Sequence, residues 1–418
     1  NRQGEPIALP SVCSAHPDVI AASALLARQK DSPLLIEATS NQVNQFGGYT
    51  GMRPSDFVAS VRDICDRVGL PAGRIIFGGD HLGPQAWRAE PPEAAMAKAE
   101  TLVSEYVRAG FTKIHLDCSE GCFGESEQVP DEVVARRSAR LARVCEDNAP
   151  DPAALVYIVG TEVPPPGGAR ADGEEHVVHP TSAASARDTL AAHRRCFSAD
   201  VSKDAWERVV GLVVQPGLEF GSDDIHRFDI QAPDHLSEAL ADYAGVAFEA
   251  HSTDYQQPDV FADLARRHFA ILKVGPALTF AYRKAIYALD EVAGWHGLRG
   301  EARLSDLLEA EMMARPESWR KYYVGEPDEV RRLRHFGYAD RIRYYWTQPV
   351  IASQVEGLMT RLESARLAAP LLDQYFAPSV ISRAQGLLPD AGSLPRALIW
   401  SQIQDALEPY YAAGSTET

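Results

Sequence analysis

Eight short apolar runs, each separated from the next by enough chain for a helix, limit the possible folds more than any other feature. They are Ile7–Ser14, Leu34–Ala38, Arg74–Gly78, Lys113–Asp117, Leu155–Gly160, Val209–Gln215, Val246–Ala250 and Phe269–Val274. Such near-continuous runs are typical of parallel strands that are buried on both faces. Segments between them, such as Pro54–Val68 and Pro92–Ala109, have the periodicity of helices. Each spacing is long enough for the crossover that parallel strands require.

Strand-then-helix units that end near residue 285 match the roughly 250 residues of a (β/α)₈ barrel. We therefore predict an α/β fold, with a TIM-type barrel over residues 1–285. Beyond Ala285 the strand pattern stops, and the remaining segments have the pattern of helices interrupted near Pro349 and Pro370. Residues 286–418 are expected to form a C-terminal helical extension that packs on the barrel, as a cap or as an oligomer surface.

The charge balance limits the expected partners, and the cysteines bear on the expected location. Lys and Arg number 41 against 58 Asp and Glu, a formal net charge of −17. An acidic surface repels phosphate backbones, so we expect no nucleic acid partner. The sequence contains no run of about 18 uninterrupted apolar residues, so it predicts no membrane span. Six cysteines at irregular spacings are typical of reduced thiols and favour a cytoplasmic location.

Polar side chains gather where the predicted strands end, which in TIM-type barrels is the active-site face. Burying such a ring costs desolvation free energy, which indicates a functional site, although each residue alone fits a structural role as well. The residues expected to bind substrate there are Glu37, Asn41, His115, Asp117 and Gln215.

Three of these strand ends can supply a metal site. His81, Glu162 and His251 follow the third, fifth and seventh runs, and we predict that they bind one divalent cation, preferably zinc, with an open fourth position. Asp80 is then free to move protons, and Asp254 can orient a ligand or act as a second base. A competing scheme needs no metal, because a desolvated Lys273 can form a Schiff base.

Phosphate recognition is predicted after the eighth run. Gly275 opens a short loop before a helix, and Arg283 follows about two turns later, where barrels commonly bind phosphate. The sequence has neither a G-x-x-x-x-G-K-[ST] loop nor a G-x-G-x-x-G turn after a strand. We therefore expect a sugar or sugar phosphate as substrate, and no ATP-dependent kinase activity.

A set of longer segments resembles the GatZ/KbaZ family, which is associated with D-tagatose-1,6-bisphosphate aldolase. The segments are Ser11–Pro17, Leu35–Met52, Gly78–Pro84, Ala109–Asp117, Gly160–Pro164, Val213–Phe220, Glu249–Gln256, Phe269–Phe280, Trp319–Tyr323 and Asp340–Trp346. This resemblance implies a barrel related to class II, zinc-dependent aldolases. It also implies a subunit that supports a catalytic class II chain in galactitol and tagatose metabolism. Other members are associated with epimerisation at carbon 4 of ketohexoses or their phosphates.

The resemblance also bears on the site. Class II aldolases use an Asp-His pair after strand three, which Asp80 and His81 fit, and a later histidine to which His251 is similar in position. Their third histidine lies in a G-T-x-H-G run, but here Glu162 follows Gly160-Thr161 with no histidine in the next ten residues. Two functions stay open: an aldolase subunit that supports a catalytic chain, or an autonomous metal-dependent aldolase or 4-epimerase.

Overall fold

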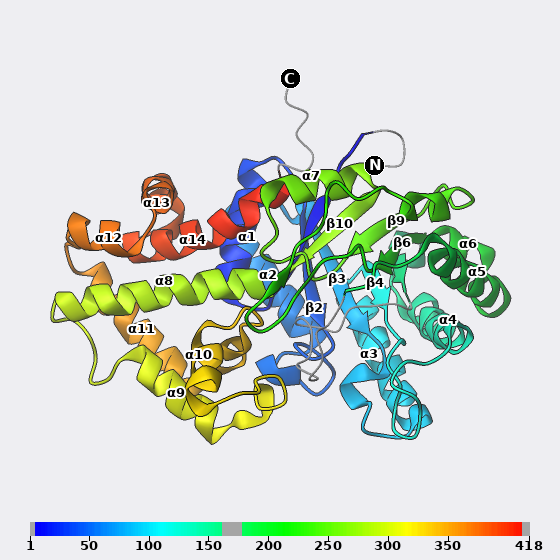
Figure 1. Cartoon of the computed structure of the whole chain (residues 1–418), viewed down its shortest axis with the longest axis horizontal. Helices are drawn as coiled ribbons and strands as arrows, with labels where there is room; N and C mark the ends of the chain where they lie inside the picture. The colour runs from blue at the N-terminus through cyan, green and yellow to red at the C-terminus, as the bar shows by residue number, and fades with distance from the viewer. Residues whose placement is uncertain (1–4, 161–177, 412–418) are drawn as a thin grey trace.

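The computed structural model describes residues 5–160 and 178–411, and a closed parallel barrel lies at its centre (Figure 1). The order of hydrogen-bonded strands around it is β1-β10-β9-β6-β5-β4-β3-β2. Their bounds are β1 (Leu9–Cys13), β2 (Leu34–Thr39), β3 (Ile75–Leu82), β4 (Lys113–Leu116), β5 (Val156–Val159), β6 (Val209–Val214), β9 (Ala247–Ala250) and β10 (Phe269–Val274). The predicted TIM-type barrel is thereby confirmed.

Strand register brings the polar strand ends to one rim. β2 and β3 pair from Leu34 opposite Ile75 to Thr39 opposite Asp80, which places Glu37 beside Gly78. A Cβ atom on Gly78 would lie only 2.6 Å from Glu37 Oε1, so the glycine makes room for a carboxylate inside the barrel. The local sequence thus admits a charged side chain into a wall that is otherwise apolar.

Helices cover the outside of the barrel, and proline in the first turn fixes the start of many of them. They are α1 (Pro17–Gln29), α2 (Pro54–Arg67), α3 (Pro92–Ala109), α4 (Asp131–Asn148), α5 (Ala183–Asp200), α6 (Lys203–Glu207), α7 (Pro258–Arg266) and α8 (Pro276–Trp295). A short antiparallel pair, β7 (Glu219–Phe220) and β8 (Ile225–His226), follows β6. Among the described helices none combines the length and the apolar character that crossing a bilayer needs.

The C-terminal part is helical, as expected from its sequence. It comprises α9 (Leu304–Ala314), α10 (Pro327–Phe336), the 3₁₀ turn η7 (Arg341–Tyr345), α11 (Pro349–Glu363), α12 (Ala369–Tyr375), α13 (Pro378–Ala391) and α14 (Leu394–Tyr411). The last helix, red in Figure 1, returns from the edge of the molecule to lie against α1 and α8. The proposed domain boundary at 285/286 falls inside α8, which is one continuous helix.

Specific contacts join α14 to the barrel. Trp400 Nε1 donates a hydrogen bond to Asp18 of α1 at 2.9 Å. The ring of Tyr410 stacks on Phe261 of α7 with centroids 4.0 Å apart, and its hydroxyl donates to the Thr253 carbonyl at 3.0 Å. These aromatic side chains are buried only because the barrel supplies the opposite surface.

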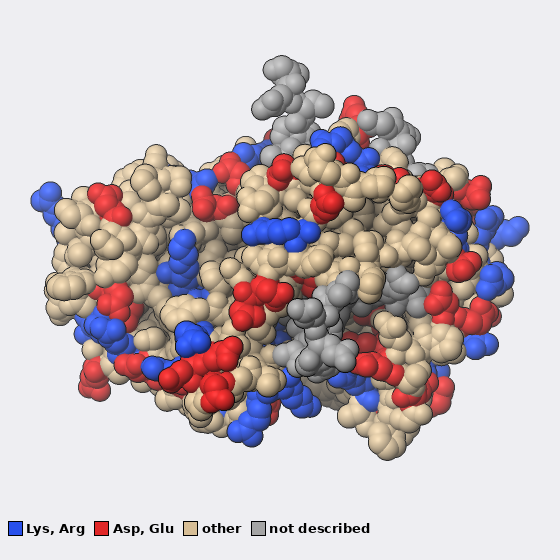
Figure 2. Space-filling view, viewed as in Figure 1, with Lys and Arg blue, Asp and Glu red and all other residues tan. Residues whose placement is uncertain are grey.

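On the face shown in Figure 2, acidic and basic side chains of the described residues are interspersed, without an extended basic patch.

Removing residues 297–418 should therefore prevent folding of the barrel. The deletion uncovers the apolar faces of α1, α7 and α8, and exposed faces of that size favour aggregation. We expect the truncated chain to be insoluble, or to lose the sharp thermal transition of the full chain in circular dichroism. A soluble fragment that unfolds cooperatively would show instead that the extension is a separate domain.

Candidate active site

A cavity of about 1020 Å³ opens at the carboxyl ends of the barrel strands. One part of its wall comes from strand ends and the loops after them, including Cys13, Asn41, His81, His251, Asp254, Lys273 and Gly275. Another part comes from the extension, including Lys321, Tyr322, Arg341, Arg343 and Tyr344. This is the face on which TIM-type barrels carry their active sites, and here the extension completes the enclosure.

Three buried imidazoles, those of His81, His115 and His251, form a cluster, and two of them, His81 and His251, line this cavity. Their ring centroids are 5.0 to 5.1 Å apart in every pairing. One nitrogen of each ring lies within hydrogen-bonding distance of a carboxylate. His81 Nδ1 lies 2.7 Å from Asp117 Oδ2. His115 Nδ1 lies 3.0 Å from Asp80 Oδ1, and His251 Nε2 lies 2.9 Å from Glu249 Oε1. Each ring is therefore fixed in orientation by a partner from the barrel.

The other nitrogen of each ring has no hydrogen-bond partner among the described residues. These atoms are His81 Nε2, His115 Nε2 and His251 Nδ1, and all three are buried. Leaving a buried polar atom unpartnered costs about 1–3 kcal/mol, so three of them in one place need an explanation. Metal-binding histidines commonly have this pattern, with a carboxylate on one nitrogen and the metal on the other.

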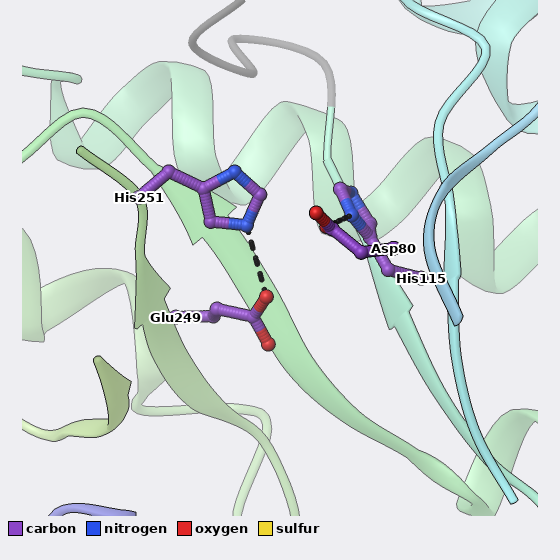
Figure 3. Close-up of side chains that lie close together, drawn as sticks. All are labelled: Asp80, His115, Glu249 and His251. Atoms are coloured by element: carbon purple, nitrogen blue, oxygen red, sulfur yellow. Dashed lines mark hydrogen bonds and ion pairs between the residues drawn. The ribbon is translucent and has the colours of Figure 1, made fainter. Parts of the chain in front are cut away.

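A second geometric observation points to the same place. Asp80, His115, Glu249 and His251 each offer one ligand atom, and these four atoms all lie within 4.8 Å of one another. Figure 3 shows His251 with its Glu249 partner facing the Asp80–His115 pair. This buried cluster can hold a metal ion, and it includes one of the predicted ligands, His251. His81 adjoins the cluster, and Glu162 lies outside the described residues.

Electrostatics favour a neutral imidazole at His251. Burial lowers its pKa well below the ordinary value, and the nearby Lys273 ammonium acts in the same direction. A neutral ring is the form that binds metal. The neighbouring Asp80 stays ionised, because His81 and Lys273 outweigh its burial and hold its pKa well below the ordinary range.

Lys273 forms an ion pair with Asp80 and also lines the cavity. Burial disfavours its charge, but Asp80 and Cys13 oppose burial and raise its pKa above the ordinary value. The Cys13 thiol itself lies 3.5 Å from Asp80 Oδ2 and donates to it. A Schiff base needs a neutral amine, so this pairing favours a charged, proton-donating Lys273 over the nucleophile of the metal-free scheme.

Beneath this layer lies a buried triad that the sequence reasoning missed. Lys113 Nζ lies 2.5 Å from Glu37 Oε1 and 2.7 Å from Glu249 Oε2, and all three side chains are almost fully buried. Burial raises the pKa of Glu37, and the Lys113 ammonium opposes that rise. Glu37 was predicted as a substrate ligand and Lys113 began one of the eight predicted strands, but the sequence did not show that the two side chains pair.

Several residues predicted to contact substrate have other partners. Glu37 belongs to the triad, and Asp117 accepts from Ser119 as well as holding His81. Gln215 Oε1 caps its own loop by accepting from the Gly217 and Leu218 amides. None of these three, nor His115, is among the described residues that line the cavity, whereas Asn41 lines it.

The two residues predicted to hold phosphate also differ from expectation. The Gly275 and Ala277 amides both donate to Asp254 Oδ1, at 3.0 and 2.8 Å. Arg283 pairs with Asp340 at 2.9 Å and does not line the cavity. The loop after β10 is thus occupied by a carboxylate of the chain itself.

Comparisons with known proteins agree with this architecture. Residues 1–415 match the model of the family described as D-tagatose-1,6-bisphosphate aldolase subunit GatZ/KbaZ-like. A relative from Agrobacterium fabrum, D-tagatose 6-phosphate 4-epimerase, is 45% identical over 99% of this chain and 96% of its own length. A crystal structure described as a probable tagatose 6 phosphate kinase from Sinorhizobium meliloti 1021 has 43% identity and a TM-score of 0.87, over 97% of this chain and 100% of that one.

Replacing Lys113 should destabilise the whole barrel. In Lys113→Met, Glu37 and Glu249 remain buried without a cation, a change that costs about 3–5 kcal/mol in the free energy of unfolding. Urea unfolding at pH 7 measures this loss. Lys98→Met is the matched control, because its ion pair with Glu90 is partly exposed and contributes at most about 1 kcal/mol. Equal losses in the two variants would contradict the role assigned to Lys113.

Proposed function

The chain belongs to the D-tagatose-1,6-bisphosphate aldolase subunit GatZ/KbaZ-like family, and from that premise we propose that it is a metal-dependent 4-epimerase of ketohexose 6-phosphates. The observation that carries the proposal is the set of three buried imidazoles, each with one carboxylate-bound nitrogen and one unpartnered nitrogen. A pure scaffold gains nothing from such a group, whereas an enzyme needs it. The whole-chain similarity to an epimerase of tagatose 6-phosphate supports the substrate class.

The donor set suits a divalent ion of the zinc type. Imidazole nitrogens are typical zinc ligands, and the residues that would hold the ion are His81, His115 and His251, with Asp117, Asp80 and Glu249 orienting the three rings. This proposal keeps His81 and His251 from the sequence prediction, and Glu162 stays a further candidate. A bound divalent ion would polarise the carbonyl at carbon 2 of the sugar.

The protein's own groups can carry out the proton transfers of retro-aldol cleavage. We assign the proton of the carbon 4 hydroxyl to Asp80, which is ionised and accepts it, while the Lys273 ammonium, which pairs with Asp80 and lines the cavity, stabilises the oxygen that loses the proton. As the proton leaves, the bond between carbons 3 and 4 breaks. Its electron pair moves to the oxygen on carbon 2 as an enolate, and carbon 4 becomes an aldehyde.

Epimerisation then requires re-addition to the opposite face of the aldehyde. After the aldehyde rotates, carbon 3 of the enolate attacks it and the new alkoxide on carbon 4 takes a proton. No atom or electron is gained or lost, so the reaction needs no oxidant or co-substrate. We assign Asp254 as the second proton-transfer group, because it lines the cavity and burial raises its pKa.

The family description favours a second candidate function, that of an aldolase subunit. The chain would then support a separate class II catalytic chain, and any activity would depend on that partner. Mixing the two purified chains distinguishes the candidates, since an autonomous epimerase does not require the partner for turnover.

The epimerase proposal predicts turnover by the purified chain alone. Incubated with D-tagatose 6-phosphate and zinc, it should form the carbon 4 epimer, D-fructose 6-phosphate, as followed by ¹H and ³¹P NMR. A chelator should abolish this conversion. Asp80→Asn should lower kcat by about 10²-fold or more, because the proton acceptor is lost. Asp63→Asn, on the exposed side of α2, is the control and should leave kcat unchanged. Absence of any epimer would contradict the proposal.

Kinase activity should be absent. The sequence contains no glycine-rich loop that could hold nucleotide phosphates. With ATP, magnesium and tagatose 6-phosphate, the pure chain should release no ADP above the background of the Asp80→Asn variant. Production of a ketohexose bisphosphate would contradict this expectation.

A further inference from the structure

If the substrate is a sugar phosphate, as the proposed function requires, its phosphate needs a site within the cavity. The usual place in a barrel is the loop after the last strands. Here both suitable amides of that loop, those of Gly275 and Ala277, already donate to Asp254. A second anion at the same place would meet the carboxylate, so the site must lie elsewhere.

The extension carries a buried arginine without a carboxylate partner. Arg283, Arg334 and Arg341 are each less than 7% exposed. Arg283 pairs with Asp340 and Arg334 with Glu309, but Arg341 has no carboxylate within 4.0 Å among the described residues. Buried charges are almost always paired, so the exception indicates a missing anion.

The contacts that Arg341 does have are neutral. Its Nε donates to the Ser318 carbonyl, and its guanidinium lies 3.3 Å from the ring centroid of Tyr322. Its Nη1 is buried and has no hydrogen-bond partner among the described residues. Because Arg341 also lines the cavity, a ligand there can supply the acceptor that this nitrogen lacks.

A second arginine of the same turn lines the cavity beside it. Arg343 Nη2 donates to the Tyr344 hydroxyl at 2.9 Å, and Nη1 is engaged only by backbone carbonyls of residues 339 and 340. Burial disfavours ionisation of Tyr344, yet Arg343 and Arg341 outweigh burial and lower the pKa of the phenol. The turn η7 therefore brings to the cavity two guanidinium groups, neither of which has an ion pair within 4.0 Å among the described residues.

A continuous row of cavity-lining side chains joins this turn to the imidazoles. Cys13 touches Asp80 at 3.5 Å and Gln42 at 4.0 Å, and Gln42 hydrogen-bonds to Tyr49. The ring of Tyr49 meets that of Tyr344 edge-on with centroids 4.6 Å apart. The imidazoles of His81 and His251 and the two arginines therefore border one cavity.

We propose that Arg341 and Arg343 of the extension bind the phosphate group of the sugar substrate. A guanidinium binds phosphate through paired N–H donors, and two of them match a dianionic monoester. Of the carboxylates in the cavity wall, Glu317, Glu356 and Glu363 are exposed, so water screens their repulsion. The other two already accept hydrogen bonds: Asp254 from the Gly275 and Ala277 amides, and Asp18 from Trp400. Through this contact the extension selects phosphorylated ketoses over free ketoses.

The test measures binding of inorganic phosphate to the full-length, zinc-loaded protein by isothermal titration calorimetry. Arg343→Gln and Arg341→Gln should each weaken phosphate binding by about tenfold or more. Arg320→Gln is the matched control. It also removes one positive charge from the helical extension, but the Arg320 side chain is exposed and does not line the cavity. Arg343→Lys, which keeps the charge, should restore part of the affinity, and circular dichroism confirms that each variant is folded.

Kinetics provide a second readout that separates sugar phosphate from free phosphate. The same substitutions should raise the KM for tagatose 6-phosphate about tenfold and the KM for unphosphorylated tagatose much less, because the free sugar has no phosphate to bind. Weaker phosphate binding in the variants supports the arginine site even if no epimerase activity is found, which would overturn only the proposed function. Undiminished phosphate binding in folded Arg341 and Arg343 variants, or no phosphate binding by the wild type, would overturn the inference.

Discussion

The pairing of buried charges inside the barrel mouth is the constraint on which the site depends. Lys113 lies between Glu37 and Glu249, and Glu249 in turn holds His251. Asp80 is likewise shared between Lys273 and His115. Because a buried charge is tolerated only when it is paired, removing one member disturbs its neighbours. The network fixes the rotation of the imidazoles, and the nitrogens left without partners are the ones available to a metal.

The helical extension is part of this site. α14 packs on α1 and α8, which anchors the extension to the barrel, while η7 places Arg341 and Arg343 in the cavity wall. The barrel thus provides the groups proposed for the reaction at carbon 4, and the extension provides those proposed to hold the phosphate. Such a division explains why the loop after β10, with Asp254 on its amides, need not bind the anion.

The sequence predicted the barrel because its strands are buried on both faces, so that apolar runs such as Phe269–Val274 coincide with strands. It also predicted that His81, His251, Asp80 and Lys273 would gather at one rim. The sequence did not predict the long-range ion pairs. Lys113 and Glu249 are 136 residues apart in the sequence, and Arg283 and Asp340 are 57 residues apart. Neither pairing leaves a local pattern, so the sequence predicted Glu37 and Arg283 as substrate ligands without showing that each forms a buried ion pair.

The most direct test of the proposed metal site is the anomalous scattering of crystals grown with zinc. A zinc ion bound there should give one strong peak about 2.0–2.2 Å from the unpartnered nitrogens of His81, His115 and His251. The opposite ring nitrogens should still be hydrogen-bonded to Asp117, Asp80 and Glu249. No peak at the three imidazoles in zinc-grown crystals, or a peak bound only by surface residues, would contradict the proposed site.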